Sequence, residues 1–111
     1  MEDKEGLTMH IGIVVTDQNF LDHALGMIDA AAARGWEMQC FLTDTGVNLL
    51  ADPEFVERAR ARPNRISVCE HSADRYVDGK FDLHAMAGFV VIGGQYQNAE
   101  LAHKCSRVLV F

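Results

Sequence analysis

This sequence has little of what would tie it to a membrane or to nucleic acid. Its 111 residues contain no apolar run near the ~20 residues that a membrane helix needs. The opening MEDKEGLTMH is acidic where a secretory signal would be basic and then apolar. Ten basic residues stand against 16 acidic ones, a net charge of −6, which argues against binding to a phosphate backbone. We therefore expect a cytoplasmic protein with no membrane partner and no direct nucleic-acid partner.

The cysteines are also too few, and too far apart, for a disulfide framework. There are three, Cys40, Cys69 and Cys105, an odd number without close pairs, which is typical of free thiols in a reducing compartment. A disulfide-exchange motif would have a second cysteine three residues after Cys69, but Ser72 stands there. Thioredoxin-type chemistry is therefore disfavoured, and each thiol has to be judged by its setting.

What the sequence does contain is the alternation of an α/β domain, in which 49% of the residues are hydrophobic and only two are proline. Residues 1–8 lack apolar periodicity and predict a loose tail before a single domain at 9–111. Short apolar runs predict strands at 10–15, 36–43, 65–69, 88–94 and 107–111. Helical spacing and capping residues predict helices over about 20–34, 53–62, 70–77 and 97–104. This order favours a flavodoxin-like three-layer α/β/α sandwich with a mostly parallel five-stranded sheet.

In such a sheet, ligands collect at the carboxyl ends of the strands. Four loops would meet there, at residues 16–19, 43–46, 69–72 and 93–97. The third of these follows the short β-branched run ISVC and delivers Cys69 to the start of a helix. Backbone amides at a helix start favour a thiolate, so Cys69 is the candidate catalytic nucleophile.

The neighbours of Cys69 act in opposite directions. Glu70 repels a thiolate, whereas His71 would modulate the thiol by sharing a proton if its ring turned towards the sulfur. The residues alone leave open whether Cys69 is reactive or fills the top of the core. Cys40, on one strand face with Met38 and Leu42, is expected in the core, and Cys105 is expected to pack at the opposite edge of the sheet.

Other chemistry has weaker support. A metal site could draw on Cys69, His71, His84, His103 and Cys105, but the C-x-H and H-x-C pairs fall at opposite ends of the expected sheet, so we assign no metal. Gly93 and Gly94 follow a strand as in a phosphate-binding turn, yet the spacing of dinucleotide and P-loop motifs is absent. No cofactor-binding residues are assigned.

Several segments together resemble the DsrE/DsrF-like family of small sulfur-relay proteins, over nearly the whole chain from Met9. They are GIVVT, the F-x-T-x-x-G-V-x-L-L run at 41–50, the V-C of ISVCEHSADR, and the closing helix followed by RVLVF. The resemblance implies a flavodoxin-like sheet, trimers, hexamers or assemblies with related subunits, and no cofactor. It also implies that Cys69 carries sulfane sulfur as a persulfide between donor and acceptor proteins. The chain departs from many relatives at Glu70, His71, Asp74 and Arg75, where they have small or apolar residues and then R-G.

Three functions follow as hypotheses. The first is an intracellular sulfur carrier or sulfurtransferase acting through a Cys69 persulfide. The second is a non-catalytic structural or regulatory subunit of a DsrE-type assembly, motivated by the charged neighbours of Cys69. The third is a small-ligand-binding flavodoxin-like module that uses Gly93 and Gly94.

Overall fold

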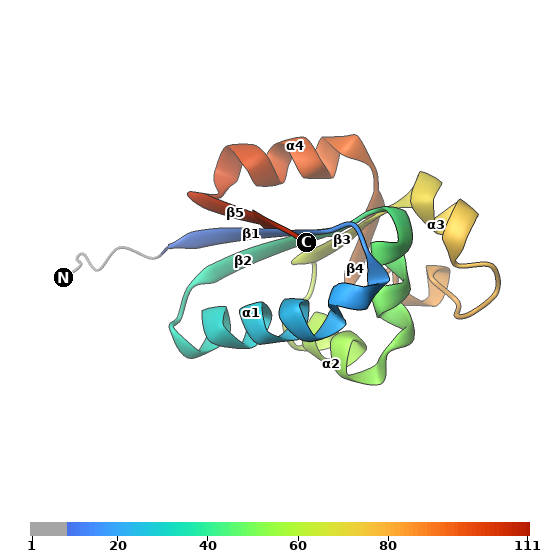
Figure 1. Ribbon diagram of the computed structural model, residues 1–111, viewed down its shortest axis with the longest axis horizontal. Coiled ribbons are helices and arrows are strands. Elements are labelled where there is room, and N and C mark those ends of the chain that lie inside the picture. Colours follow the sequence, from blue (N-terminus) through green and yellow to red (C-terminus); the bar gives the residue numbers. More distant parts are fainter. Residues whose placement is uncertain (1–8) are drawn as a thin grey trace.

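The computed structural model describes residues 9–111, so the tail expected at 1–8 lies outside the described part (Figure 1). Within it, strands and helices alternate along the chain. The strands are β1 (His10–Val15), β2 (Glu37–Leu42), β3 (Ile66–Cys69), β4 (Val90–Gly93) and β5 (Arg107–Val110). The helices are α1 (Leu21–Ala33), α2 (Pro53–Ala61), α3 (Glu70–Tyr76) and α4 (Gln95–Lys104), with 3-10 segments η1 (Gln18–Phe20), η2 (Asp44–Ala51) and η3 (His84–Met86).

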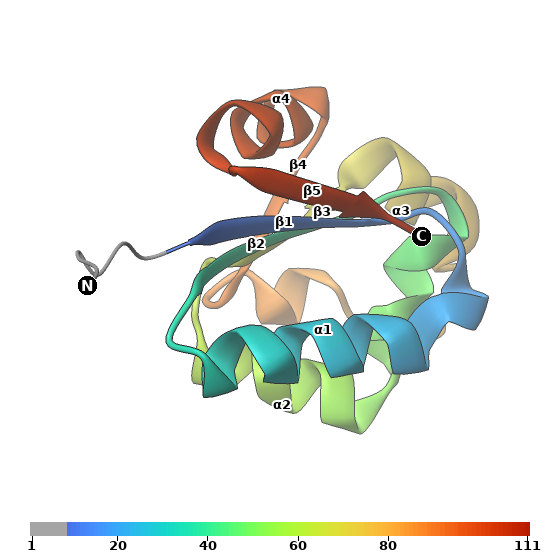
Figure 2. The same cartoon turned by 60° about the vertical axis from the view of Figure 1, so that its left-hand side comes forward.

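All five strands are parallel and form one sheet in the order β4-β3-β2-β1-β5. The chain moves outward from β1 to β4 and then crosses back to place β5 on the other side of β1. Because parallel crossovers are right-handed, this reversal puts α1 and α2 on one face and α4 on the other (Figures 1 and 2). The expected α/β class and the three-layer flavodoxin-like arrangement are confirmed.

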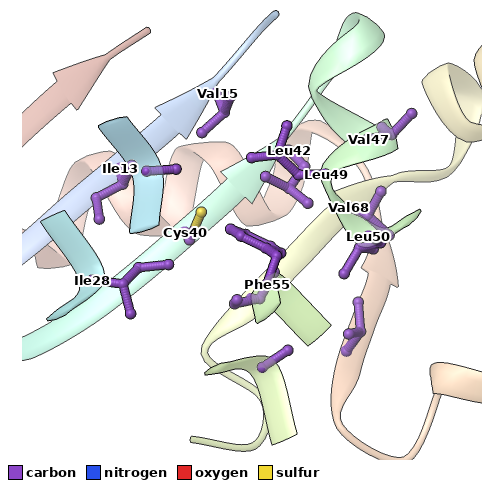
Figure 3. Close-up of a cluster of buried hydrophobic side chains, with 14 of the residues drawn as sticks. Ile13, Val15, Ile28, Cys40, Leu42, Val47, Leu49, Leu50, Phe55 and Val68 are labelled. Atoms are coloured by element: carbon purple, nitrogen blue, oxygen red, sulfur yellow. The ribbon is translucent and has the colours of Figure 1, made fainter. Parts of the chain in front are cut away.

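The face towards α1 and α2 carries the larger core. Strand alternation points Ile13, Cys40 and Ile66 to this face, and all three are buried. Phe55 of α2 and Leu49 of η2 close over them (Figure 3). This continuous apolar layer accounts for most of the buried side chains, so it is the main source of stability.

The opposite face, towards α4, has a much smaller apolar cluster of Val14, Phe41, Cys69 and Leu101. Helix α4 lies close to the sheet because Gly12 has no side chain: a Cβ there would come within 2.5 Å of the Leu101 side chain. Cys69, the candidate nucleophile, therefore belongs to the thinner of the two cores.

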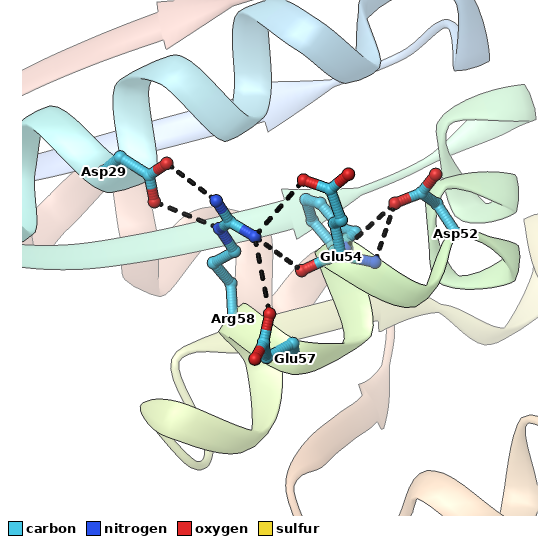
Figure 4. A network of polar contacts seen from close by, with 6 residues as sticks. Asp29, Asp52, Glu54, Glu57 and Arg58 are labelled. Atoms are coloured by element: carbon cyan, nitrogen blue, oxygen red, sulfur yellow. Dashed lines mark hydrogen bonds and ion pairs between the residues drawn. The ribbon is translucent and has the colours of Figure 1, made fainter.

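Helix α2 begins as its sequence predicts. Asp52 accepts hydrogen bonds from the amides of Glu54 and Phe55, and Pro53 occupies the first helical position (Figure 4). Arg58 of the same helix makes a two-point contact with Asp29 of α1, at 2.9 and 3.1 Å. This contact joins the two helices that cover the larger core.

Some boundaries differ from those expected. Residues 44–51, between a predicted strand and a predicted helix, form the 3-10 segment η2, in which Gly46 packs against the Val15 carbonyl, where a Cβ would clash. Helix α4 starts two residues early, at Gln95, since the Gln97 side chain accepts the Gly94 amide. Strand β4 starts at Val90, two residues later than expected. No helix in residues 9–111 has the length and apolar content to cross a membrane.

Candidate functional site

The carboxyl ends of the strands meet at one edge of the sheet, and their loops contact one another. The Gln18 amide, after β1, donates to the Thr45 hydroxyl, after β2, at 3.2 Å. The Thr43 and Ser72 hydroxyls, after β2 and β3, lie 3.2 Å apart. The Asp44 amide donates to Ser72 Oγ at 2.9 Å. Three of the four loops expected to build a site are thus joined by hydrogen bonds between their own side chains and amides.

Cys69 is the last residue of β3 and immediately precedes α3, as its sequence predicts. Its register neighbour on β4 is Gly93, and strand alternation turns its side chain to the α4 face. The residue is 7% exposed and packs in the cluster with Phe41 and Leu101. The sulfur therefore sits at the edge of an apolar layer, beside the loops that carry hydroxyl groups.

Hydrogen-bond donors around Cys69 favour its charged form. Burial raises the pKa of the thiol, but four nearby donor groups together outweigh this and bring the pKa below its ordinary value. They are the Ser72 hydroxyl, the Ser72 and His71 amides, and the Thr43 hydroxyl. Cys69 is thus set up to be a thiolate more often than a free cysteine at the same pH.

Ser72 holds the centre of this arrangement and is itself 5% exposed. A hydroxyl has one proton to donate and two lone pairs to accept with. Because the Asp44 amide already fills one lone pair of Ser72 Oγ, the Ser72 proton is available to the Cys69 sulfur. A buried hydroxyl fixed in this way stabilises a thiolate better than a solvated one, since it needs no reorientation when the charge forms.

The two charged neighbours of Cys69 lie at the surface. Glu70 and His71 are both exposed at the start of α3. His71 acts on Cys69 through its backbone amide, and neither the His71 ring nor the Glu70 carboxylate is among the groups that shift the Cys69 pKa. The proton-sharing role expected of the His71 ring therefore stays a prediction.

The Gly93 and Gly94 turn is filled by the chain itself. The Gln97 side chain lies against Gly93, where a Cβ would clash with it, and its Oε1 accepts the Gly94 amide at 2.8 Å. A separate polar cleft of about 160 Å³ lies between α4 and strands β2 to β4; its lining includes Gln39, Ser67 and Gln97 but not Cys69. The amide that a phosphate would use is therefore already engaged.

The other two thiols differ from Cys69 as expected. Cys40 lies fully buried in the larger core, and burial raises its pKa to about 12. Cys105 is half-buried just before β5, at the opposite end of the sheet, and burial raises its pKa despite the nearby Lys104 ammonium. In residues 9–111, no group of three or more His, Cys, Asp or Glu side chains is placed to hold a metal ion.

Sequence reasoning missed Thr43 and Ser72. Both lie in loops that were expected at the site, but hydroxyl residues are common in loops and at helix starts, so they carried no distinct signal. The available signal was positional: Thr43 ends the second strand, and Ser72 stands three residues after the cysteine. Only the β2–β3 pairing, which brings the ends of the two strands together, makes them partners.

Comparison of the chain with protein-family models, with curated proteins and with solved structures finds no match.

Proposed function

We propose that this protein is a sulfur carrier that holds sulfane sulfur as a persulfide on Cys69. The observation that supports this best is the convergence of two hydroxyls and two amides on one cysteine sulfur, which lowers its pKa. The other two thiols have raised pKa values. A nucleophilic sulfur must be deprotonated, so Cys69 is the thiol suited to the task.

The transfer step can be written with the residues present. The Cys69 thiolate attacks the outer sulfur of a donor persulfide, R–S–SH. A bond forms between Cys69 Sγ and that sulfur, the donor S–S bond breaks, and R–S⁻ leaves with the electron pair. The product is Cys69–S–SH, which an acceptor thiolate attacks in the same way. The exchange consumes no oxidant and no reductant, and it needs no cofactor.

The same hydrogen-bond donors would also stabilise the Cys69 persulfide that the transfer produces. A persulfide is more acidic than a thiol, so its outer sulfur carries negative charge at neutral pH. The Thr43 and Ser72 hydroxyls, whose oxygens lie 3.2 Å apart, can donate to that charge. The partners in this proposal are a sulfur donor protein and a sulfur acceptor protein, and association with further copies or related subunits belongs to the same proposal.

Persulfide loading tests the proposal. Purified protein is incubated with a persulfidated donor and analysed by intact-mass spectrometry. Wild type should gain one sulfur atom, about 32 Da, and Cys69→Ala should gain none. Cys105→Ala is the matched control, because it removes the most exposed of the three thiols and should load like wild type. Equal loading of wild type and Cys69→Ala would overturn the proposal.

A non-catalytic subunit is the second candidate, and the 7% exposure of Cys69 is the observation that favours it. A thiol this enclosed reacts slowly unless the site opens. Under this alternative, iodoacetamide at neutral pH would modify Cys69 no faster than Cys40. Alkylation of Cys69 well ahead of Cys40 would remove the alternative.

A further inference from the structure

The outer edge of β5 is the largest exposed apolar feature of the described chain. Its exposed side chains are Val108 at 40%, Leu109 at 37% and Val110 at 65%. The strand has one charged residue, Arg107, and no proline. Edge strands are normally protected from pairing by charges, proline or bulges, and β5 has almost none of this protection.

Only alternate residues of β5 use their backbone groups in hydrogen bonds to β1. The Phe111 amide donates to the Val14 carbonyl at 2.8 Å, and the Phe111 carbonyl accepts from the Thr16 amide. In a parallel ladder alternate residues turn their backbone groups to the same neighbour, so Leu109 also faces β1. The amides and carbonyls of Val108 and Val110 therefore point outward, along an edge that no other strand of residues 9–111 covers (Figure 2).

We infer that β5 pairs antiparallel with β5 of a second copy across a two-fold axis, joining two five-stranded sheets into one of ten strands. The register follows from the outward groups. The register that uses the outward groups of both valines in both copies places Val108 opposite the partner's Val110 and Val110 opposite the partner's Val108. Leu109 then lies at the axis, opposite its own copy. The pairing makes four backbone hydrogen bonds between the outward groups.

The side chains of this register are complementary. Val108 and Val110 both lie on the α4 face and pair with one another across the strands, while the two Leu109 side chains meet on the α1 face. Arg107 falls opposite Phe111 of the second copy, where a guanidinium can lie over the ring. In this register each side chain of β5 therefore has a suitable cross-strand neighbour in the second copy.

The charges near β5 also suit a second copy, although the protein is acidic overall, at −6. Asp29 of α1 points away from β5, towards Arg58 of α2, at 2.9 Å. Glu100 of α4 faces the polar cleft over β2 to β4. Two β5 edges can therefore approach without repulsion between these carboxylates. One four-residue strand is small against the ~1,200 Å² of a stable interface, so we expect micromolar dissociation.

Sedimentation velocity at concentrations from about 1 µM to 1 mM tests this inference. Wild type should shift from monomer to dimer or a multiple of it. Val110→Lys should weaken the association at least tenfold, because it places two charges against apolar neighbours. Tyr96→Lys is the matched control: it makes the same change at an exposed residue of α4, 68% exposed and away from the edge, and should associate like wild type.

Val110→Pro is a second variant, since its amide is not used within the chain and its loss should block pairing without breaking the β1–β5 ladder. Hydrogen exchange gives an independent readout: the Val108 and Val110 amides should gain protection as concentration rises. A monomer at 1 mM, or association that survives both Val110 variants, would overturn the inference. Loss of association in Tyr96→Lys alone would also overturn it. None of these outcomes depends on Cys69 chemistry.

Discussion

The two faces of the sheet treat their cysteines in opposite ways. On the α1 face, Cys40 is surrounded by apolar side chains, and burial alone sets its pKa, raised to about 12. On the α4 face, Cys69 is nearly as buried, yet its pKa is lowered because hydroxyls and amides reach its sulfur. Depth alone does not set the thiol pKa here, because the polar groups at the end of the strand lower that of Cys69.

The two cores also differ in size, and the core that contains Cys69 is the smaller one. The α1 face is covered by two helices and η2, and its buried cluster includes twenty residues, whereas four make up the cluster on the α4 face. The site is therefore built on the less stabilising side. A change at Cys69 or Ser72 disturbs few packing contacts, so its effect on reactivity can be separated from its effect on folding.

Removing the largest side chain contributed by α2 should have the greatest effect on stability. Phe55 is fully buried beneath the sheet, and Phe55→Ala should cost about 3–5 kcal/mol of unfolding free energy through lost burial and the cavity left behind. Urea denaturation measures this. A cost below that of Leu101→Ala, on the thinner face, would contradict the assignment of the main core.

Alkaline pH should destabilise the protein through Cys40. The unfolded thiol ionises near pH 9, whereas the native one keeps its proton to about pH 12. Between these values the native state holds the extra proton, so stability falls as pH rises, by about 1.4 kcal/mol per unit. Cys40→Ala should be less stable at pH 7 but show a shallower decline above pH 9.

Cys69→Ala is the control for that measurement, because the pKa of Cys69 is shifted in the opposite direction from that of Cys40. The native Cys69 pKa is lowered, so the group adds stability above the unfolded pKa and loses it as pH falls through the native value. Removing Cys69 should therefore not flatten the alkaline decline. If both variants flattened it equally, burial of Cys40 would not be the cause.

Removing the Ser72 hydroxyl should bring Cys69 closer to Cys40 in behaviour. A hydrogen bond to a charged group contributes about 1.5 kcal/mol or more, so Ser72→Ala should raise the Cys69 pKa and slow its alkylation at pH 7 roughly tenfold. Alkylation rates measured by mass spectrometry test this. Ser106→Ala is a matched control, because its exposed hydroxyl bonds only the His10 carbonyl, and should leave the rate unchanged.

The smallest effect is expected at His71. The His71 side chain is exposed, and its backbone amide is the part of the residue that stabilises the thiolate. Because exposed side chains interact only weakly with a nearby charge, His71→Ala should change the rate of Cys69 alkylation less than about twofold. The pH profile of the rate should also keep its shape. A tenfold drop in the rate would show that the imidazole shares a proton with the sulfur.

Sequence reasoning reached the elements and the nucleophile but not the environment of the sulfur. The apolar run of β1 and the Asp52–Pro53 start of α2 are local signals, and both were predicted to the residue. The 3-10 form of η2 depends on Gly46 packing against the Val15 carbonyl, a long-range contact. The pairing of Thr43 with Ser72 depends on strand order in the same way. A single sequence does not show which loops become neighbours in the folded protein.

Site-resolved titration of the three thiols in one sample tests the central claim most directly. Wild-type protein is alkylated briefly at each pH from 6 to 11, and the modified fractions of Cys40, Cys69 and Cys105 are read by peptide mass spectrometry. The structure predicts that Cys69 titrates first, below the pH of an ordinary thiol, with Cys105 above it and Cys40 last. Titration of Cys69 at or above the pH at which Cys105 titrates would contradict the account.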